Sequence, residues 1–373
     1  MRRGKMLLII IAIIWGMASV AIGAEKQKVI RWRFQSIWPP AINLIEGDKH
    51  FVGLVNKLAG GRLKIDFYPG GALVGGFELF DAVAKGTIEA GGDWPNYWAG
   101  KNTAFDLLGS FPMLLTPGDY FVWIWQGGGL ELYQEIYGKY GLVYFPHTNT
   151  SMESGVRSNK PIRTLKDYAG LKIRMSGRNQ GKILKDIGAA QVMMAGGEIY
   201  QALERGVIDA AEFCNPSTDW GMGFQEVTKY WASPGWHQPN SVLGVMINKK
   251  AWDALPDDLK YIIKVAAQAT FTWSWSFFEY SAIDGTKKFL EKGIKLTRLD
   301  DDSLKKLQEL AWKHLLEDAR ANPDFAKVAY SQVKFLHDFA HWRTICKPFS
   351  FGRNPKGLEK VLKELETLVK GKK

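Results

Sequence analysis

A nine-residue pattern occurs twice in this chain, and it constrains the fold more than any other feature of the sequence. Residues 82–90 read AVAKGTIEA, and residues 202–210 read ALERGVIDA. Each copy follows a Gly–Gly pair and describes a helix, a glycine at the helix end and a short buried strand. We therefore expect two similar α/β lobes, with coincidence between two common helix–glycine–strand units as the alternative.

Sequence patterns of strands and helices alternate before residues 82–90, the first copy. Another strand pattern precedes residues 202–210, the second copy. Strands are expected over residues 29–36, 62–68 and 171–175, with a helix over residues 42–58. This alternation predicts βαβ units and mixed, mainly parallel sheets. A ligand is then expected in the crevice between the lobes, at the carboxyl ends of the strands.

The C-terminal half is expected to be mostly helical. A strand over residues 242–248 is followed by a helical turn, a long helix, an amphipathic helix and a solvated helix, over residues 251–255, 259–280, 302–322 and 357–370. The long helix carries an aromatic stripe: Phe271, Trp273, Trp275, Phe277 and Phe278. Aromatic residues are enriched at subunit interfaces as well as in cores. We expect this stripe to be an interface rather than core, so that the protein forms a homodimer.

The N-terminus has the layout of a secretory signal peptide. Arg2, Arg3 and Lys5 precede an uncharged run over residues 6–20, and small residues follow that run. The run is shorter than the roughly 20 apolar residues that cross a bilayer. We expect residues 1–24 to be removed and the remaining chain to be exported to the periplasm.

Composition narrows the function class. The net charge is +11, but the basic residues are scattered, which favours a solvated surface over nucleic-acid binding. Cys214 and Cys346 are too few for a disulfide scaffold, and the histidine pair His337 and His341 is interpreted as incidental. No metalloprotease, serine-hydrolase or nucleotide-binding motif is present. Nothing requires catalysis, although 15 tryptophans and scattered carboxylates leave an exported carbohydrate-active enzyme as the alternative to a binding protein.

Polar and aromatic side chains stand near the ends of the expected strands. They are Arg174, Glu212, Asn149, Glu153, Trp94 and Tyr97. A guanidinium in a crevice grips a carboxylate through two parallel hydrogen bonds, which makes Arg174 the candidate anchor for an acidic ligand. The alternatives are an ordinary ion-paired arginine and aromatic rings that belong to the core.

Seven stretches of the chain carry a family resemblance. They are residues 67–72, 82–90, 97–101, 170–174, 195–200, 206–212 and 234–236, the last of which reads Pro-Gly-Trp. Together they resemble the solute-binding proteins of TRAP (tripartite ATP-independent periplasmic) transporters, the DctP family. The α-keto-acid and lactate receptors of that family are the more similar subgroup. The resemblance runs from Trp32 to about Leu290.

The resemblance implies an α/β, two-lobed periplasmic binding protein fold, with two hinge strands and a long spanning helix. The first lobe would contain residues 25–148 and about 239–270, the second residues 149–238 and about 283–345, with a spanning and dimerisation helix over 259–282 and a C-terminal helical extension over 346–373. It also implies a receptor rather than an enzyme, which passes a small organic acid unchanged to the small and large permease subunits in the membrane. The expected ligand is a 2-oxo or 2-hydroxy monocarboxylate, with a dicarboxylate or an aromatic acid as alternatives.

The resemblance further implies roles for single residues. The substrate-binding residues would be Arg174, which takes the carboxylate, and Asn149, Glu153, Trp94, Tyr97 and Phe213. Glu212, the backbone of Phe213 and Gln238 would hold a cation, Na⁺ or Ca²⁺, that bridges protein and substrate.

Three positions depart from the usual pattern of this subgroup. It has glutamine, tryptophan and glutamate where this chain has Glu153, Phe213 and Gln238. The exchange between positions 153 and 238 preserves the total charge of the site, as a retained cation requires. We therefore expect Glu153 to join the cation ligands. The alternative is that the metal has been lost and that Glu153 pairs with Arg157 or Arg178.

Overall fold

The computed structural model describes residues 29–346, which fall into two compact units. Within that range, the first unit contains residues 29–94, 137–149 and 243–281, and the second contains residues 95–136, 150–242 and 282–346. The expected signal peptide, residues 1–24, and the helix expected over residues 357–370 lie outside the described residues.

The first unit is built on a mixed five-stranded sheet of order β2-β1-β3-β10-β4. Its strands are β1 (Ile30–Gln35), β2 (Leu63–Tyr68), β3 (Ala90–Asp93), β4 (Leu142–Asn149) and β10 (Val242–Asn248). β1 pairs in parallel with β2 and β3, whereas β10 runs antiparallel to β3. Trp32, Phe34 and Ile65 are buried between charged neighbours, as the alternating sequence pattern predicts.

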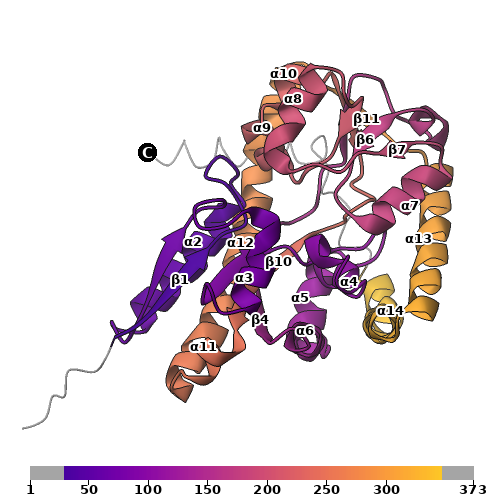
Figure 1. Ribbon diagram of the computed structural model, residues 1–373. Helices are drawn as coiled ribbons and strands as arrows, with labels where there is room; N and C mark the ends of the chain where they lie inside the picture. The colour runs from indigo at the N-terminus through magenta and orange to yellow at the C-terminus, as the bar shows by residue number, and fades with distance from the viewer. Residues whose placement is uncertain (1–28, 347–373) are drawn as a thin grey trace, which may run out of the picture. The chain divides into compact units, whose positions relative to one another are not determined.

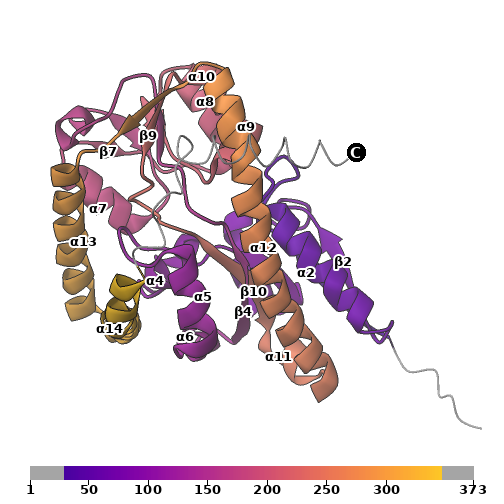
Figure 2. The same ribbon diagram turned by 180° about the vertical axis from the view of Figure 1, so that it is seen from behind.

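Short helices accompany this sheet: a 3-10 turn (Gly76–Glu78), α2 (Ile45–Leu58), α3 (Leu79–Ala84) and α11 (Lys249–Asp253). Helix α2 packs along β2 (Figure 2), and its Phe51 ring lies 6.3 Å from the Phe34 ring. The strands and the helix expected over residues 29–68 are thus confirmed.

The second unit contains a mixed six-stranded sheet of order β11-β9-β5-β8-β6-β7. Its strands are β5 (Val156–Ser158), β6 (Lys172–Arg174), β7 (Ala190–Gln191), β8 (Ala210–Ala211), β9 (Tyr230–Ser233) and β11 (Lys295–Arg298). β6 pairs in parallel with β7 and β8, and β11 pairs in parallel with β9. β5 runs antiparallel to β8 and β9, so the sheet is mixed and mainly parallel, as expected.

The second unit also contains most of the helices of the described chain. They are 3-10 turns (Pro95–Trp98, Leu165–Tyr168, Gly196–Glu198), α4 (Phe105–Gly109), α5 (Pro117–Gln126), α7 (Arg178–Asp186), α8 (Ile199–Glu204), α9 (Pro216–Gly221), α10 (Phe224–Val227), α13 (Asp301–Ala321) and α14 (Pro323–Ile345). α6 (Gly129–Gly138) and α12 (Asp257–Glu291) contain residues of both units. Among residues 29–346, no helix combines the length and the hydropathy that crossing a bilayer requires.

The two copies of the sequence pattern fold alike. In each, a 3-10 turn leads into a helix, α3 or α8, and a glycine then turns the chain into a strand, β3 or β8. The glycines are Gly86 and Gly206, with φ of 77° and 69°. An L-residue with a side chain rarely adopts this left-handed conformation, which is why the same glycine ends both helices. The expected repetition of an α/β unit is confirmed.

One stretch belongs to a different unit than the sequence suggested. We expected residues 95–136 in the first lobe, but they group with the second unit. α14, which the sequence patterns did not predict, holds them there: Gln332 donates a hydrogen bond to the Leu107 carbonyl, and Asn102 donates one to Asp324. α13 and α14 pack side by side (Figure 1), so α14 joins this stretch to the rest of the second unit.

The aromatic stripe of α12 is divided between core and surface. Phe271 and Phe278 are fully buried, whereas Trp273, Trp275 and Phe277 are half-buried. Positions seven residues apart lie on the same helix face, so Phe271 and Phe278 share the inward face. The expectation that the stripe is interface rather than core is therefore wrong for these two residues, and it stays a prediction for the other three.

Candidate functional site

Two paired parallel strands bring the first two site residues together. In the ladder between β6 and β8, Arg174 stands opposite Ala211, so Glu212 follows at the same edge of the sheet. The carboxyl ends of parallel strands meet at one edge, which places both side chains side by side. Arg174 Nη1 donates to Glu212 Oε1 at 2.8 Å and to the Glu212 carbonyl at 2.9 Å. Both side chains are buried.

A close approach between two loops adds Glu153 and His237. Glu153 lies between β4 and β5, and His237 follows β9. The backbone of Gly235 lies so near Glu153 that a Cβ at position 235 would come within 2.4 Å of the Glu153 carbonyl oxygen. Only glycine permits this approach, which explains the physical need for the glycine in Pro-Gly-Trp.

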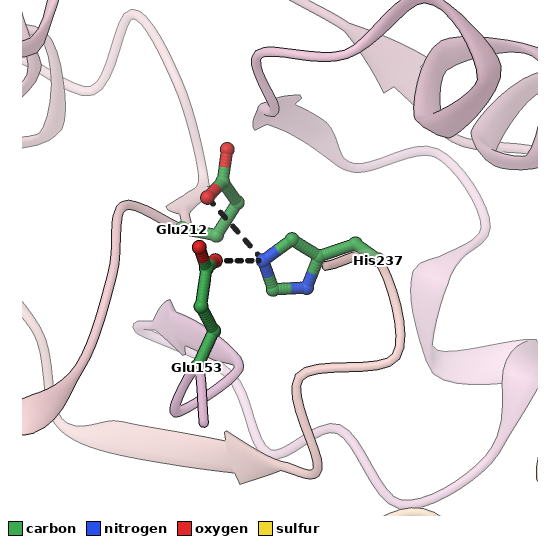
Figure 3. A group of neighbouring side chains, drawn as sticks. All are labelled: Glu153, Glu212 and His237. Atoms are coloured by element: carbon green, nitrogen blue, oxygen red, sulfur yellow. Dashed lines mark ion pairs between the residues drawn. The ribbon is translucent and has the colours of Figure 1, made fainter. Parts of the chain in front are cut away.

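Glu153, Glu212 and His237 form a buried cluster (Figure 3). His237 Nε2 lies 3.3 Å from Glu153 Oε2 and 3.3 Å from Glu212 Oε2, and all three side chains are at most 1% exposed. One ligand atom from each residue lies within 4.8 Å of the other two. Neither contact has hydrogen-bond geometry, so these three atoms have no hydrogen-bond partner among the described residues. Two carboxylate oxygens and an imidazole nitrogen are atoms that metal ions take as ligands, so this cluster is a candidate metal site.

The second oxygen of each carboxylate is held in place. Glu212 Oε1 accepts from Arg174 and from the amide and hydroxyl of Ser176, at 3.0 and 3.2 Å for the latter two. Glu153 Oε1 accepts from the Ser241 hydroxyl at 2.7 Å. Each carboxylate is thus oriented by one oxygen and presents the other to the His237 ring.

Burial and mutual charge shift the acidity of the cluster. Burial raises the pKa of Glu153 to about 7, against the opposing effect of His237. Burial acts in the same direction on Glu212, but the Arg174 charge and His237 outweigh it and hold the pKa of Glu212 below its usual value. Burial lowers the pKa of His237, yet the two carboxylates outweigh burial and raise it to about 9. A cation that binds here competes with a proton.

Gln238 and Phe213 are neighbours of the cluster, and the expected role of the Phe213 backbone as a cation ligand stays a prediction. Gln238 Oε1 accepts from the Ser176 hydroxyl at 3.4 Å, and its amide nitrogen donates to the Ser241 hydroxyl at 3.1 Å. The Phe213 ring lies 5.3 Å from the Arg174 guanidinium carbon, a cation–π distance. Gln238 therefore buttresses the two serines that orient the carboxylates, and its role as a direct cation ligand stays a prediction.

Tyr97 is the expected aromatic residue that lies near this group. Burial raises the pKa of its phenol, while the neighbouring Arg174 charge acts in the opposite direction. Trp94 and Asn149 belong to the first unit, where both are buried and the Asn149 amide donates to the Ser274 hydroxyl at 3.0 Å. Their contribution to the site stays a prediction.

The alternative partners considered for Glu153 are occupied elsewhere. Arg157 pairs with Asp219 at 2.9 Å, and Arg178 pairs with Asp106 at 3.0 Å. The alternative that Glu153 pairs with Arg157 or Arg178 is therefore wrong for the described residues. The Glu153 carboxylate faces His237 because two loops pack against each other. Nearness in the sequence to a charged residue such as Arg157 does not decide its neighbour.

Sequence reasoning missed His237. It was one of six scattered histidines, and no metal-binding spacing connects it with Glu153 or Glu212. Its only signal was its place directly after Pro-Gly-Trp and before Gln238, a residue already expected at the site.

Comparison with known proteins gives this geometry a context. The model of the family described as bacterial extracellular solute-binding protein, family 7, matches residues 34–320. A monocarboxylate 2-oxoacid-binding periplasmic protein of Nostoc sp. is 31% identical over 319 residues, which cover 85% of this chain and 86% of the relative.

Solved structures agree with the fold. A TRAP transporter solute binding protein from Bordetella bronchiseptica, a mixed occupancy dimer with calcium and picolinate in its bound active site, superposes with a TM-score of 0.82 and 29% identity, covering 86% of this chain and 95% of that chain. A TRAP periplasmic solute binding protein from Pseudoalteromonas atlantica with bound sodium and pyruvate has a TM-score of 0.82 and 28% identity, covering 88% and 100%. The expected α/β fold class is confirmed.

Proposed function

Since this chain belongs to family 7 of the bacterial extracellular solute-binding proteins, we propose that it is the receptor of a TRAP transporter for a small 2-oxo or 2-hydroxy monocarboxylate. The observation that carries the proposal is the buried group of Arg174, Glu153, Glu212 and His237 at one edge of the second sheet. The Arg174 guanidinium offers a positive charge of fixed position for a carboxylate. Beside it, Glu153, Glu212 and His237 offer ligand atoms for a cation.

Arg174 is the proposed anchor of the substrate carboxylate. Its guanidinium is buried and fixed by the Glu212 side chain and backbone, so its direction is set before the ligand arrives. A planar guanidinium offers donors in a fork that fits a carboxylate, which a lysine ammonium does not. Tyr97 and Phe213 beside Arg174 would form the aromatic wall of the site.

A cation would complete the site. The free oxygens of Glu153 and Glu212 converge on one point, and the solved relatives named above hold calcium or sodium together with their organic acids. A 2-oxo or 2-hydroxy acid offers such an ion two oxygens that close a five-membered ring. A plain monocarboxylate lacks the second oxygen, so the ion would select the proposed substrate class.

No chemical step is required of this site. The receptor would close on its solute and then release it unchanged to the small and large permease subunits, with ligand binding shifting the population toward the closed state. We place the mature protein in the periplasm after removal of residues 1–24. A receptor for a dicarboxylate or an aromatic acid is the second candidate, because the same guanidinium would bind one carboxylate of either.

We also propose a homodimer through the outer side of α12. Tyr280 and Ile283 are 78% and 65% exposed there, and the half-buried rings of Trp273, Trp275 and Phe277 flank this side of the helix. Aromatic and apolar residues in this number are typical of a subunit interface.

Calorimetry on the mature chain tests the function. Titration with pyruvate, lactate, succinate and benzoate should give one-to-one binding of pyruvate or lactate and at least tenfold weaker binding of the other two, a difference of about 1.4 kcal/mol. Mass spectrometry of the incubated acid should show it unchanged. Tighter binding of succinate or benzoate would move the protein to the second candidate, and a new product would support the exported enzyme instead.

A further inference from the structure

The buried cluster differs from an ordinary calcium or sodium site in one donor. Two of its three unpartnered atoms are carboxylate oxygens, but the third is the imidazole nitrogen His237 Nε2. Calcium takes six to eight oxygen ligands, whereas imidazole suits zinc, copper, iron and nickel. The two carboxylates therefore fit any of these cations, whereas the imidazole fits the all-oxygen preference of calcium poorly.

An oxygen donor is available nearby and is turned elsewhere. Gln238 follows His237 directly, and its side-chain oxygen accepts from the Ser176 hydroxyl while its nitrogen donates to Ser241. His237 Nε2 therefore faces the two free carboxylate oxygens, whereas the Gln238 amide forms hydrogen bonds with Ser176 and Ser241. The imidazole is the member of this pair that faces the cluster (Figure 3).

The spacing of the donors suits a small ion. His237 Nε2 is 3.3 Å from each free carboxylate oxygen. A tetrahedral ion with bonds of about 2.0–2.2 Å to nitrogen and oxygen separates its ligands by roughly 3.3–3.5 Å. The two distances from His237 Nε2 match such an ion, and the two carboxylate oxygens lie within 4.8 Å of each other.

Charge balance favours a divalent ion, a step that rests on the function proposed above. A metal on Nε2 displaces the proton of His237, so the imidazole is neutral, Glu153 and Glu212 carry two negative charges, Arg174 carries one positive charge, and the proposed substrate carries one negative charge. A divalent ion brings the buried site to neutrality, whereas sodium leaves one uncompensated negative charge, which is costly away from water.

We propose that this receptor holds a borderline divalent cation of the zinc class, ligated by Glu153 Oε2, Glu212 Oε2 and His237 Nε2. Three protein ligands leave a tetrahedral ion one open position, and the two chelating oxygens of the organic acid would expand it to five ligands. This receptor would then differ from the relatives that bind calcium or sodium, because it would bind its organic acid together with an ion of the zinc class.

Metal competition on the wild-type chain is the first test. Protein freed of metal with a chelator is titrated with Zn²⁺ alone, and then again in the presence of Ca²⁺ or Na⁺ in about 100-fold excess. We expect one Zn²⁺ per chain, retained against both ions, and a Co²⁺-loaded form with the visible absorption of nitrogen-ligated cobalt. Displacement of Zn²⁺ by either ion, or a cobalt spectrum of an all-oxygen site, would overturn the proposal.

A pair of matched variants tests the ligand. His237→Gln should weaken Zn²⁺ binding by more than the roughly 10–100-fold that follows loss of an outer-sphere partner. His314→Gln is the control, because His314 also lies between two carboxylates, Asp186 at 2.9 Å and Glu317 at 2.8 Å, but outside the cluster. Equal Zn²⁺ affinity in His237→Gln and wild type would contradict the assignment of His237 as a ligand. If that variant fails to fold, the metal competition on the wild-type protein still tests the proposal.

Failure of this proposal is distinguishable from failure of the proposed function. If pyruvate binds the calcium-loaded or sodium-loaded protein and Zn²⁺ does not bind preferentially, only the metal assignment is wrong. If Zn²⁺ binds as expected and no organic acid binds any loaded form, the receptor function is wrong and the metal site stands.

Discussion

Arg174 and Glu212 form a buried ion pair across the ends of two paired parallel strands, with Arg174 Nη1 2.8 Å from Glu212 Oε1. Neither side chain is more than 1% exposed. Burying two charges is costly, and removal of one partner leaves the other uncompensated. A pair of this kind is therefore a poor choice for stability alone and a good one for a site whose charges must be fixed in direction before a charged ligand arrives.

Replacing Arg174 by lysine should weaken binding of the organic acid. Arg174→Lys keeps the positive charge but loses the planar fork, so the binding free energy should fall by roughly 1.5–3 kcal/mol, the range of charge-assisted hydrogen bonds. Calorimetry with pyruvate measures the change. Arg298→Lys, at an exposed arginine that pairs with Asp301, should leave the dissociation constant as it is. An unchanged dissociation constant in Arg174→Lys would remove this residue from its proposed role.

Removing the cation should abolish tight binding of the acid, whichever ion the site holds. After chelation and dialysis into sodium-free buffer, the acid loses the bonds of its two oxygens to the ion, and a proton on His237 takes the place of the ion between Glu153 and Glu212. Affinity should return when one equivalent of the ion is added. If affinity survives this treatment and elemental analysis finds no ion, Arg174 and neutral hydrogen bonds hold the acid alone.

Asp106 should make stability depend on pH between about 4 and 6. Burial raises the pKa of Asp106 to about 6, against the attraction of Arg178, from its usual 3.8. The folded state then binds the extra proton across that window, so the free energy of unfolding falls as pH rises from about 4 to 6. The effect totals about 3 kcal/mol at 1.36 kcal/mol per pKa unit.

Chemical denaturation of wild type and Asp106→Asn at several pH values measures this contribution. The difference in free energy of unfolding between variant and wild type should grow with pH up to about pH 6 and then level off. Parallel curves across the whole range would mean that Asp106 is ionised in the folded state throughout.

A charged residue on the outer side of α12 should separate the proposed dimer. Tyr280→Glu, at a side chain that is 78% exposed, should give the mass of a monomer in light scattering at concentrations where wild type is a dimer, because an uncompensated charge buried in an interface is costly. Phe271→Ala is the contrast, because Phe271 is fully buried and its loss should cost roughly 3–5 kcal/mol of stability. A wild type that is monomeric at every concentration would show that α12 forms no interface.

Local patterns determined much of the fold. The alternation in β1 and β2, the two helix–glycine–strand units ending at Gly86 and Gly206, and the length of α13 all follow from side-chain periods and backbone conformations within a few residues. The same reasoning placed Arg174 and Glu212 at strand ends. Because β6 and β8 are parallel neighbours, position along the strand was enough to bring these two together.

Other features depended on how distant segments pack. The inward position of Phe271 and Phe278, the place of residues 95–136 in the second unit and the helix α14 follow from contacts between elements far apart in the sequence. Hydrophobic periodicity shows which residues prefer burial, but it does not show which neighbour covers them.

The cluster of Glu153, Glu212 and His237 shows the same division most clearly. The sequence alone determined that Glu212 closes a strand and that a Pro-Gly-Trp turn precedes Gln238. Only the tertiary structure decided that Glu153 and His237 meet Glu212, since the meeting depends on one backbone approach, at Gly235, between loops about 80 residues apart. Local preferences act over a few residues, whereas a set of ligands is defined by distances of a few ångströms between residues far apart in the sequence. Only the packing of the whole chain determines those distances.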